Sequence, residues 1–173
     1  MPSTYTLISS NVLSSSAASV TFSAIPSTYT DLVFRISARG QRAIYIDGLV
    51  MQFNGDSATN YSTRLLTGTG TAASSFGNAN QTSLSFNSIV GDGATANTFS
   101  STEVYIPNYN STAAKPLGVI THTENNSATD YFMRALANLY RGSSGISSVV
   151  FSPEIGPNFV AGSSFYLYGI KNS

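Results

Sequence analysis

The stretch Leu49-Val50-Met51-Gln52-Phe53-Asn54-Gly55-Asp56-Ser57-Ala58-Thr59-Asn60-Tyr61-Ser62-Thr63-Arg64-Leu65 contains the strongest structural signal in the chain. Two runs in which apolar and polar residues alternate flank Asn54-Gly55-Asp56, and alternation with period two is typical of β-strands. Asn and Gly tolerate positive φ, and Asp can hydrogen-bond its own backbone two residues on. We therefore predict two antiparallel strands joined by a tight turn and a short polar loop.

Short alternating runs continue along most of the chain. Further strands are expected at Tyr5–Ile8, Ser19–Ser23, Asp31–Ser37, Ser83–Ile89, Thr102–Pro107, Leu117–Thr123, Ile146–Phe151 and Ser164–Ile170. Ala43–Ile46 is either a short strand or an ordered loop. Tyr131–Arg141 contains good helix formers, but a strand is favoured in a chain with no other helix. The pattern predicts an all-β fold, and 173 residues suit a single domain over residues 1–173.

Charged residues make up only 9% of the chain, with eight basic and eight acidic residues and a net charge of zero. The basic residues are scattered, so the clustered Lys and Arg that bind nucleic acid are missing. No apolar run is long enough to span a bilayer, and the N-terminus lacks the features of a secretory signal. A neutral surface rich in Ser, Thr and Asn suits a subunit of an assembly better than a free monomer.

Few residues in the sequence suggest chemistry. No cysteine is present, which excludes disulfides and thiolate metal sites. The only histidine, His122, can share a strand face with Glu124, but the favoured interpretation is a surface histidine. Nucleophile-elbow and phosphate-binding motifs are absent, and no carboxylate pair suggests a glycoside hydrolase. We expect a protein that is not an enzyme, with no catalytic residues and no cofactor.

One alternative in the opening stretch is a calcium site. Asn54, Asp56 and Asn60 supply oxygen atoms at short spacing, as hard cations require. No bidentate Glu ends the loop, so turn formation is the favoured role of these three residues.

The aromatic residues, ten Tyr and ten Phe, are expected mainly in the core of a sandwich. Tyrosine is also enriched at protein contacts, and four tyrosines are candidate interface anchors: Tyr105, Tyr109, Tyr166 and Tyr168. Two segments rich in small and polar residues, Thr67–Gln81 and Gly91–Thr98, are predicted to be loops; Phe76 is the single apolar anchor of the first. Long loops in compact domains often make functional contacts.

Four parts of the chain together form a recognisable signature: Ile25-Pro26-Ser27-Thr28-Tyr29-Thr30-Asp31-Leu32, Phe53-Asn54-Gly55-Asp56 with Asn60-Tyr61-Ser62, Ile106-Pro107-Asn108-Tyr109, and Gly162-Ser163-Ser164-Phe165-Tyr166-Leu167-Tyr168-Gly169-Ile170. On these residues the sequence resembles small virion structural proteins of tailed phages, particularly those of marine and cyanobacterial hosts. The resemblance implies a single antiparallel β-sandwich of jelly-roll type, without known catalytic residues.

The leading hypothesis is a capsid decoration (cement) protein of the virion, assembled in the host cytoplasm. It would bind the outer surface of the major capsid protein lattice, as a homotrimer or other symmetric oligomer, and would contact neither nucleic acid nor membrane. The alternative is a tail-fibre or receptor-binding module whose loops recognise host surface glycan. A glycan-degrading enzyme is the third and weakest hypothesis.

Overall fold

The computed structural model describes residues 4–126 and 131–171, and all regular elements in these ranges are β-strands. The strands are β1 (Tyr5–Val12), β2 (Val20–Phe22), β3 (Asp31–Ser37), β4 (Ile46–Phe53), β5 (Tyr61–Gly68), β6 (Ala73–Gln81), β7 (Leu84–Val90), β8 (Ser101–Ile106), β9 (Lys115–His122), β10 (Met133–Tyr140), β11 (Val149–Pro153) and β12 (Ser164–Ile170). The predicted all-β fold class is confirmed.

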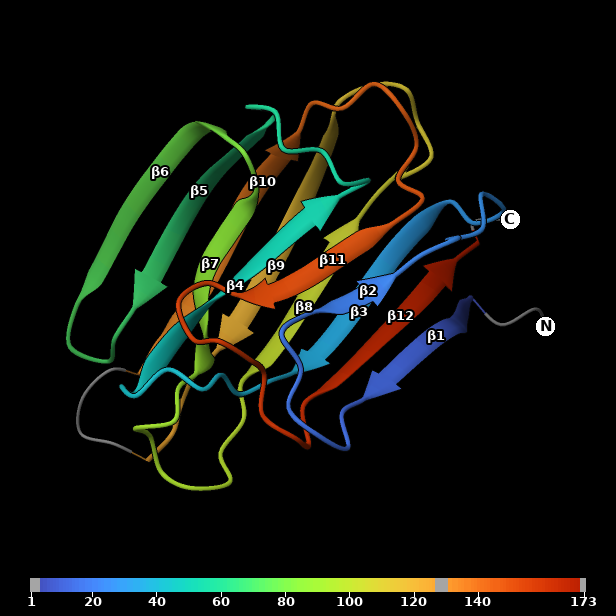
Figure 1. Cartoon of the computed structure of the whole chain (residues 1–173). Coiled ribbons are helices and arrows are strands. Elements are labelled where there is room, and N and C mark those ends of the chain that lie inside the picture. Colours follow the sequence, from blue (N-terminus) through green and yellow to red (C-terminus); the bar gives the residue numbers. More distant parts are fainter. Residues whose placement is uncertain (1–3, 127–130, 172–173) are drawn as a thin grey trace.

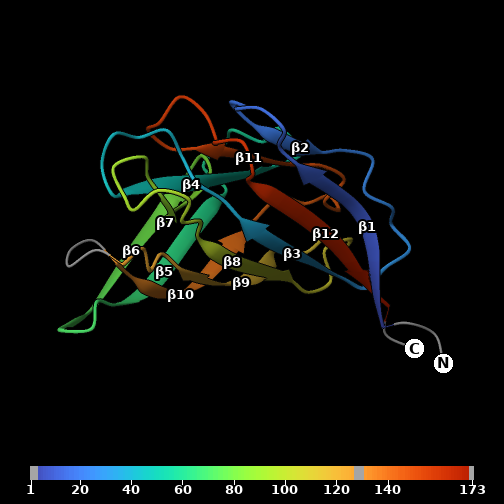
Figure 2. The ribbon, with the colours of Figure 1, turned by 90° about the horizontal axis from the view of Figure 1, so that it is seen from below.

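The strands form two sheets of unequal size (Figure 1). The large sheet has the order β1-β12-β3-β8-β9-β10-β5-β6, and the small sheet has the order β2-β11-β4-β7. Neighbouring strands in both sheets are antiparallel. Figure 2 shows the two sheets as separate layers, so the structure is an antiparallel β-sandwich. The jelly-roll connectivity that the resemblance implies stays a prediction.

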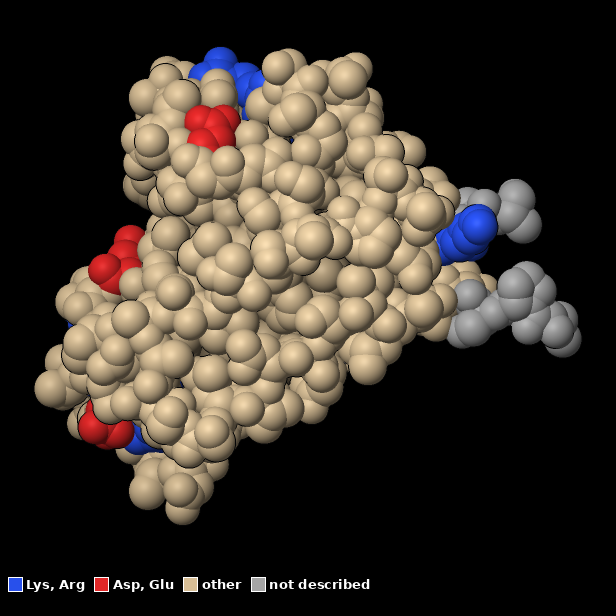
Figure 3. Space-filling view, turned by 45° about the vertical axis from the view of Figure 1, so that its right-hand side comes forward, with Lys and Arg blue, Asp and Glu red and all other residues tan. Residues whose placement is uncertain are grey.

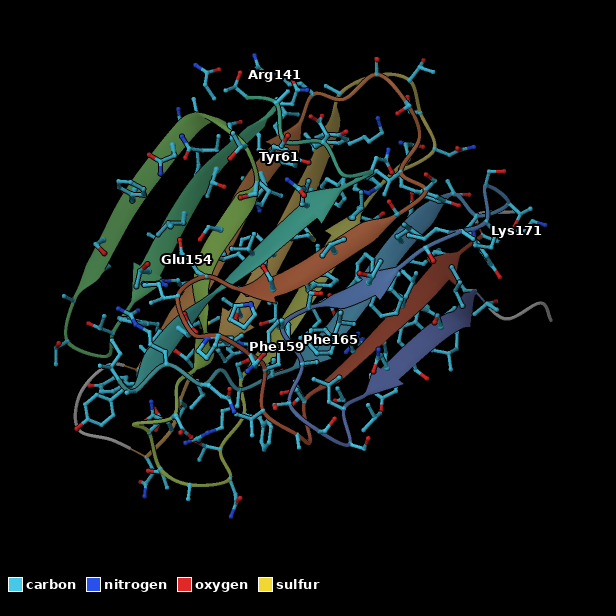
Figure 4. All side chains as sticks on the ribbon, in the orientation of Figure 1. Tyr61, Arg141, Glu154, Phe159, Phe165 and Lys171 are labelled. Atoms are coloured by element: carbon cyan, nitrogen blue, oxygen red, sulfur yellow. The ribbon has the colours of Figure 1, made fainter. Side chains whose placement is uncertain are left out.

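The core lies between the two layers and is rich in phenylalanine. Phe34 of the large sheet packs against Phe151 of the small sheet, with ring centroids 5.2 Å apart. Phe165 of β12 contacts Phe159, with centroids 5.0 Å apart, and both point into the interior (Figure 4). All four side chains are fully buried. Such edge-on aromatic pairs add to the stability gained from burial alone.

Most strand predictions agree with the structure. Asp31–Ser37 and Ser164–Ile170 are β3 and β12 with the same bounds, and the strand interpretation of Tyr131–Arg141 is confirmed by β10. In Ala43–Ile46, for which the sequence allowed either a strand or a loop, only the last residue belongs to a strand. Ile146–Phe151 was predicted as a strand, but β11 begins three residues later, at Val149.

The predicted loop Thr67–Gln81 is wrong, because most of it is strand β6. A tight turn precedes β6, in which the N–H of Thr69 donates to the carbonyl of Ala72 at 3.0 Å. Gly70 has φ +78° in this turn, the conformation that a two-residue hairpin needs. β6 could not be predicted from the sequence, because its nine residues are all exposed and do not alternate between apolar and polar.

The stretch around Asn54-Gly55-Asp56 is a tight turn but not a hairpin. The N–H of Asp56 donates to the carbonyl of Phe53 at 2.8 Å, and Asn54 and Gly55 have φ of 53° and 66°. However, β4 lies in the small sheet and β5 in the large sheet, so the predicted pairing of the two strands is wrong. The residues between the turn and β5 carry the chain from one layer to the other. We call Phe53–Tyr61 the corner.

Tyr61 closes the corner from the first position of β5. Its hydroxyl accepts from the N–H of Phe53 at 3.1 Å and donates to the carbonyl of Asp56 at 3.0 Å. The ring is buried between Phe53 and Tyr140, and Tyr140 stacks on it with centroids 4.9 Å apart. Burial raises the pKa of the Tyr61 hydroxyl to about 12, so this side chain stays neutral at physiological pH. Figure 4 shows Tyr61 in the upper part of the view, where β5 begins.

Replacing Gly55 by valine tests the corner. A Cβ at Gly55 would meet no atom within 4 Å, so only the positive φ opposes the substitution. We expect Gly55→Val to lower the free energy of unfolding by about 1 to 3 kcal/mol, because β-branched residues are strained in this region. The measurement is chemical denaturation. Gly68→Val is the matched control, since Gly68 also has open space but lies in a strand without a positive φ. Equal stability of the two variants would contradict the corner geometry.

Candidate functional site

The three residues considered for calcium are engaged in structural hydrogen bonds. The Asn54 side-chain oxygen accepts from the N–H groups of Ser147 and Ser148 at 2.9 and 3.1 Å, and its amide nitrogen donates to the carbonyl of Gly145 at 2.9 Å. Asn54 thus ties the corner to the loop before β11. Among the described residues, no group of three or more His, Cys, Asp or Glu side chains is arranged to hold a metal ion.

The Asp56 carboxylate organises the corner from inside. It accepts from the N–H of Ala58 at 2.8 Å, from the amide of Asn60 at 2.8 Å and from the hydroxyl of Tyr140 at 3.1 Å. These hydrogen bonds, with that from Asn60 the strongest influence, hold the Asp56 pKa below its ordinary value. The contacts of Asn54 and Asp56 support turn formation over a calcium site.

His122 and Glu124 do not form the pair considered from the sequence. His122 is exposed at the end of β9, and the Glu124 carboxylate accepts from the N–H of Asn126 at 2.7 Å. Within residues 4–126 and 131–171, the salt bridges found are Arg35–Glu103 and Arg39–Asp92.

The segment Gly91–Thr98 is an ordered loop built around a buried arginine. Arg39 is 5% exposed, and its guanidinium lies 3.6 Å from the Asp92 carboxylate. The same guanidinium donates to the backbone carbonyls of Asp92, Ala94, Thr95 and Thr98. The contacts of this loop therefore satisfy the buried Arg39 side chain, and none of them indicates a ligand.

No strand of the described residues covers the face of the large sheet that points away from the small sheet (Figure 2). We call it the outer face. Its register places Ile120 of β9 between Glu103 and Ala135, and Leu66 of β5 beside Ala135. Large apolar side chains on it are 40 to 57% exposed: Tyr5, Leu7, Leu66, Tyr105, Ile120 and Met133. An exposed apolar set of this size on one face is typical of a binding surface.

A shallow groove of about 540 Å³ runs over the centre of the outer face. Small residues form its floor, namely Gly118, Ala135 and Ala137. Tyr105, Ile120 and Leu66 stand beside them. A Cβ at Gly118 would meet no atom within 4 Å, which shows that the floor is open to solvent. The groove thus offers an apolar recess into which side chains of a partner protein fit.

Tyr105 is held in place on this face. Its hydroxyl donates to the Asp31 carboxylate at 2.8 Å, and the N–H of Asn108 donates to the other carboxylate oxygen at 2.9 Å. The hydrogen bond to Asp31 raises the pKa of Tyr105 above its ordinary value. A fixed ring loses little freedom on binding, which favours affinity.

The other three candidate tyrosine anchors differ in where their side chains lie. Tyr166 and Tyr168 lie half-buried on the outer face, beside a second groove of about 520 Å³ that Arg35 and His122 also line. Tyr109 is fully buried, and its hydroxyl donates to the carbonyl of Pro26. The prediction of Tyr109 as an interface anchor is wrong, because the residue fills the core beneath the loop that precedes β3.

Charge contributes little to the outer face. Arg35 and Glu103 form an ion pair at 2.7 Å near its centre, with side chains 60 and 44% exposed. An exposed pair of this kind stabilises the fold only weakly but neutralises both charges. On the side of the molecule shown in Figure 3, charged side chains likewise form only small separate spots.

Two apolar doublets in the sequence indicate the outer face, although the strand predictions made no use of them. The doublets Leu65-Leu66 and Val119-Ile120 break the alternation and place apolar residues on both sides of β5 and β9. Val119 is buried, whereas Leu66 and Ile120 are exposed. A strand that is apolar on both sides must be covered on both sides, or must bind something.

A third recess, the inner groove, lies where β5 and β6 extend past the edge of the small sheet at β7 (Figure 1). It consists of two adjoining cavities of about 420 and 280 Å³. Both are lined by Leu65, Phe76, Asn78, Gln81, Ser85 and Glu154. The Glu154 carboxylate, labelled in Figure 4, accepts from the hydroxyl of Ser85 at 2.7 Å.

Comparisons of this chain with protein-family models, with curated proteins and with solved structures found no match. The described residues form no helix of the length and apolarity needed to cross a membrane.

The low pKa of Asp56 predicts a pH dependence of stability. A carboxylate with a folded-state pKa below its unfolded value stabilises the fold above that unfolded value, near 3.8, and this stabilisation is lost as the pH falls through the folded value. We expect Asp56→Asn to lower stability at pH 7 by about 1 kcal/mol, a figure reduced for solvent exposure. Below pH 3 the difference should shrink. Melting curves across this range test it, and a pH-independent difference would contradict the assignment.

Proposed function

We propose that this protein is a non-enzymatic virion component, a capsid decoration protein whose outer face binds the major capsid protein lattice. The observation that carries the proposal is the uncovered outer face, with its apolar side chains, fixed Tyr105 ring and open groove. The resemblance to tailed-phage virion proteins supplies the kind of partner.

The outer face has to make contact over a broad area, which suits a partner that is itself a protein surface. Burying the exposed half of one isoleucine contributes about 1 kcal/mol, whereas association costs several kcal/mol. A stable contact therefore has to use most of the outer face, and standard interfaces bury roughly 800 Å² on each partner. Because the face is nearly neutral, we expect binding that depends weakly on salt.

Substitution of Ile120 tests the proposal. Ile120→Asp places a charge beside the groove and should weaken binding to capsids that lack the protein by at least tenfold. The melting temperature should fall by only a few degrees, because the side chain is 48% exposed and the Arg35 ion pair offsets part of the repulsion between Asp at position 120 and Glu103. Ile155→Asp is the matched control, since Ile155 is 59% exposed and follows β11, an inner strand of the other layer. The measurement is co-sedimentation with capsids.

Two results would overturn the proposal. One is a wild-type protein that does not sediment with capsids, while particles without it resist heat as well as complete ones. The other is equal binding of the Ile120→Asp and Ile155→Asp variants, which would move the contact away from the outer face.

The inner groove favours recognition of a host surface glycan as a second candidate function. Phe76 is 58% exposed there, and an aromatic ring can stack on the apolar face of a sugar. Asn78 and Gln81 place amide groups beside it, which suit paired hydroxyls. If this function holds, the glycan contact predicted for Thr67–Gln81 would be made from strand β6 instead of from a loop.

A glycan array separates the two candidate functions. If the inner groove binds sugar, wild-type protein should retain specific glycans, and Gln81→Ala should reduce that signal severalfold without changing the melting temperature. Asn158→Ala, which alters an amide near Gln41 outside the groove, serves as the control. An array without signal would remove the glycan function and leave the capsid proposal intact.

A further inference from the structure

Strand β6 ends the large sheet, and its run Ala73–Asn78 carries none of the features that protect an edge strand; its one register shift against β5 lies after this run. The nine residues of β6 are all exposed and include no charged residue and no proline. The other sheet edges have shorter regular runs. In the described part of the chain, β2 has three residues, and β1 and β7 each have a register shift within the strand. Monomeric proteins usually protect a long edge by charge, proline, bulges or short length.

The run Ala73–Asn78 of β6 is regular, because the register shift against β5 lies beyond it, between the pairs Tyr61–Gln81 and Thr63–Asn78. The backbone hydrogen bond from the N–H of Thr69 to the carbonyl of Ala72 determines which residues of the run form backbone hydrogen bonds with β5. Hydrogen-bonded pairs alternate along an antiparallel ladder. Ser74, Phe76 and Asn78 therefore point their backbone groups at β5. Ser75 and Gly77 point theirs outward, away from β5, where the described residues form no further strand.

We propose that β6 of a second copy of this chain pairs antiparallel with β6, around a two-fold axis at Phe76. In this register Ser75 faces Gly77 of the second copy, and their outward N–H and C=O groups bond to each other. The two Phe76 side chains then face each other in a pair without backbone bonds, where side chains approach most closely. Phe76 is the only large apolar residue of β6, and this register is the one that buries it against its equivalent.

Charge favours a copy of the same chain as the partner. An isologous contact sets each group opposite its own equivalent, so a charged edge would repel itself. β6 has no charge to repel. Arg64, the nearest cation on β5, lies flat over Gly77, where its guanidinium donates to the carbonyls of Thr63 and Asn78. It therefore leaves the outward edge clear.

The pairing has a consequence for the shape of the dimer. A two-fold axis perpendicular to the sheet joins the two large sheets edge to edge and keeps both outer faces on one side. It also brings Phe76 of the second copy to the open end of the inner groove. The dimer needs neither the capsid nor the glycan function, so its mass and its crosslinking can be measured without either. It would, however, cover the Phe76 ring that the glycan function uses.

Proline substitutions test the edge contact. Ser75→Pro removes an N–H that points outward, so it should abolish dimerisation and leave the melting temperature of the monomer nearly unchanged. Ser74→Pro is the matched control, because its lost N–H points at Thr67 on β5 and the fold itself should be destabilised. Size-exclusion chromatography with light scattering gives the mass, and thermal melting gives the stability.

Cysteine pairs test the register, since the chain has no cysteine of its own. In the proposed register, position 74 faces position 78 of the second copy, and the two Cα atoms are about 4.5 Å apart, which a disulfide can bridge. The same positions within one chain are about 13 Å apart and cannot be bridged. The double variant Ser74→Cys/Asn78→Cys should form a covalent dimer on oxidation, and each single variant should not.

Three outcomes would overturn the proposal. Wild-type protein of monomer mass would exclude the dimer, and a dimer that persists in Ser75→Pro would place the contact elsewhere. Crosslinking of the double variant no faster than of the single variants would exclude the register. Loss of dimerisation in Ser75→Pro with capsid binding retained would support the pairing and separate it from the proposed function.

Discussion

The hydrogen bonds of the Tyr61 hydroxyl, to the N–H of Phe53 and the carbonyl of Asp56, are the contacts on which the two-layer arrangement depends. They fix the angle at which the chain leaves the small sheet and enters the large one. Asn54 connects the same corner to the loop before β11, and Asp56 connects it to Tyr140 of β10. One short segment thus binds strands of both sheets, through groups that are neutral or fully hydrogen-bonded.

The sequence predicted the fold class well, because alternation along strands such as β3 and β12 directly records which side faces the core. It failed where position depends on partners far away in the chain. Asn54-Gly55 specifies a turn, but whether the next strand pairs with β4 or crosses to the other sheet depends on β10 and β6, which take β5 as neighbour. β6 escaped prediction because neither of its faces is buried, so nothing selects for alternation.

The candidate site was harder to predict than the fold for a related reason. Tyr105 and Tyr109 look alike in the sequence, yet one stands on the outer face and the other lies under Pro26 in the core. Exposure is decided by what covers a strand, and no local pattern encodes that. The apolar side chains of the outer face, such as Leu66 and Ile120, are of the same types as those of the core, and they are exposed because no described element covers them.

The position of β12 in the large sheet has a consequence for biosynthesis. β12 lies between β1 and β3, so the pairing of Tyr5 with Ile170 joins residues at opposite ends of the sequence. On the ribosome, β1 has no strand to pair with, and β3 can pair only with β8, until the chain has been made through Ile170. Contacts of such sequence separation form slowly, and unpaired strand edges are prone to pair with the wrong partner meanwhile. The nascent chain therefore has to keep β1 and one edge of β3 soluble until β12 emerges, a requirement that its many Ser, Thr and Asn residues help to meet.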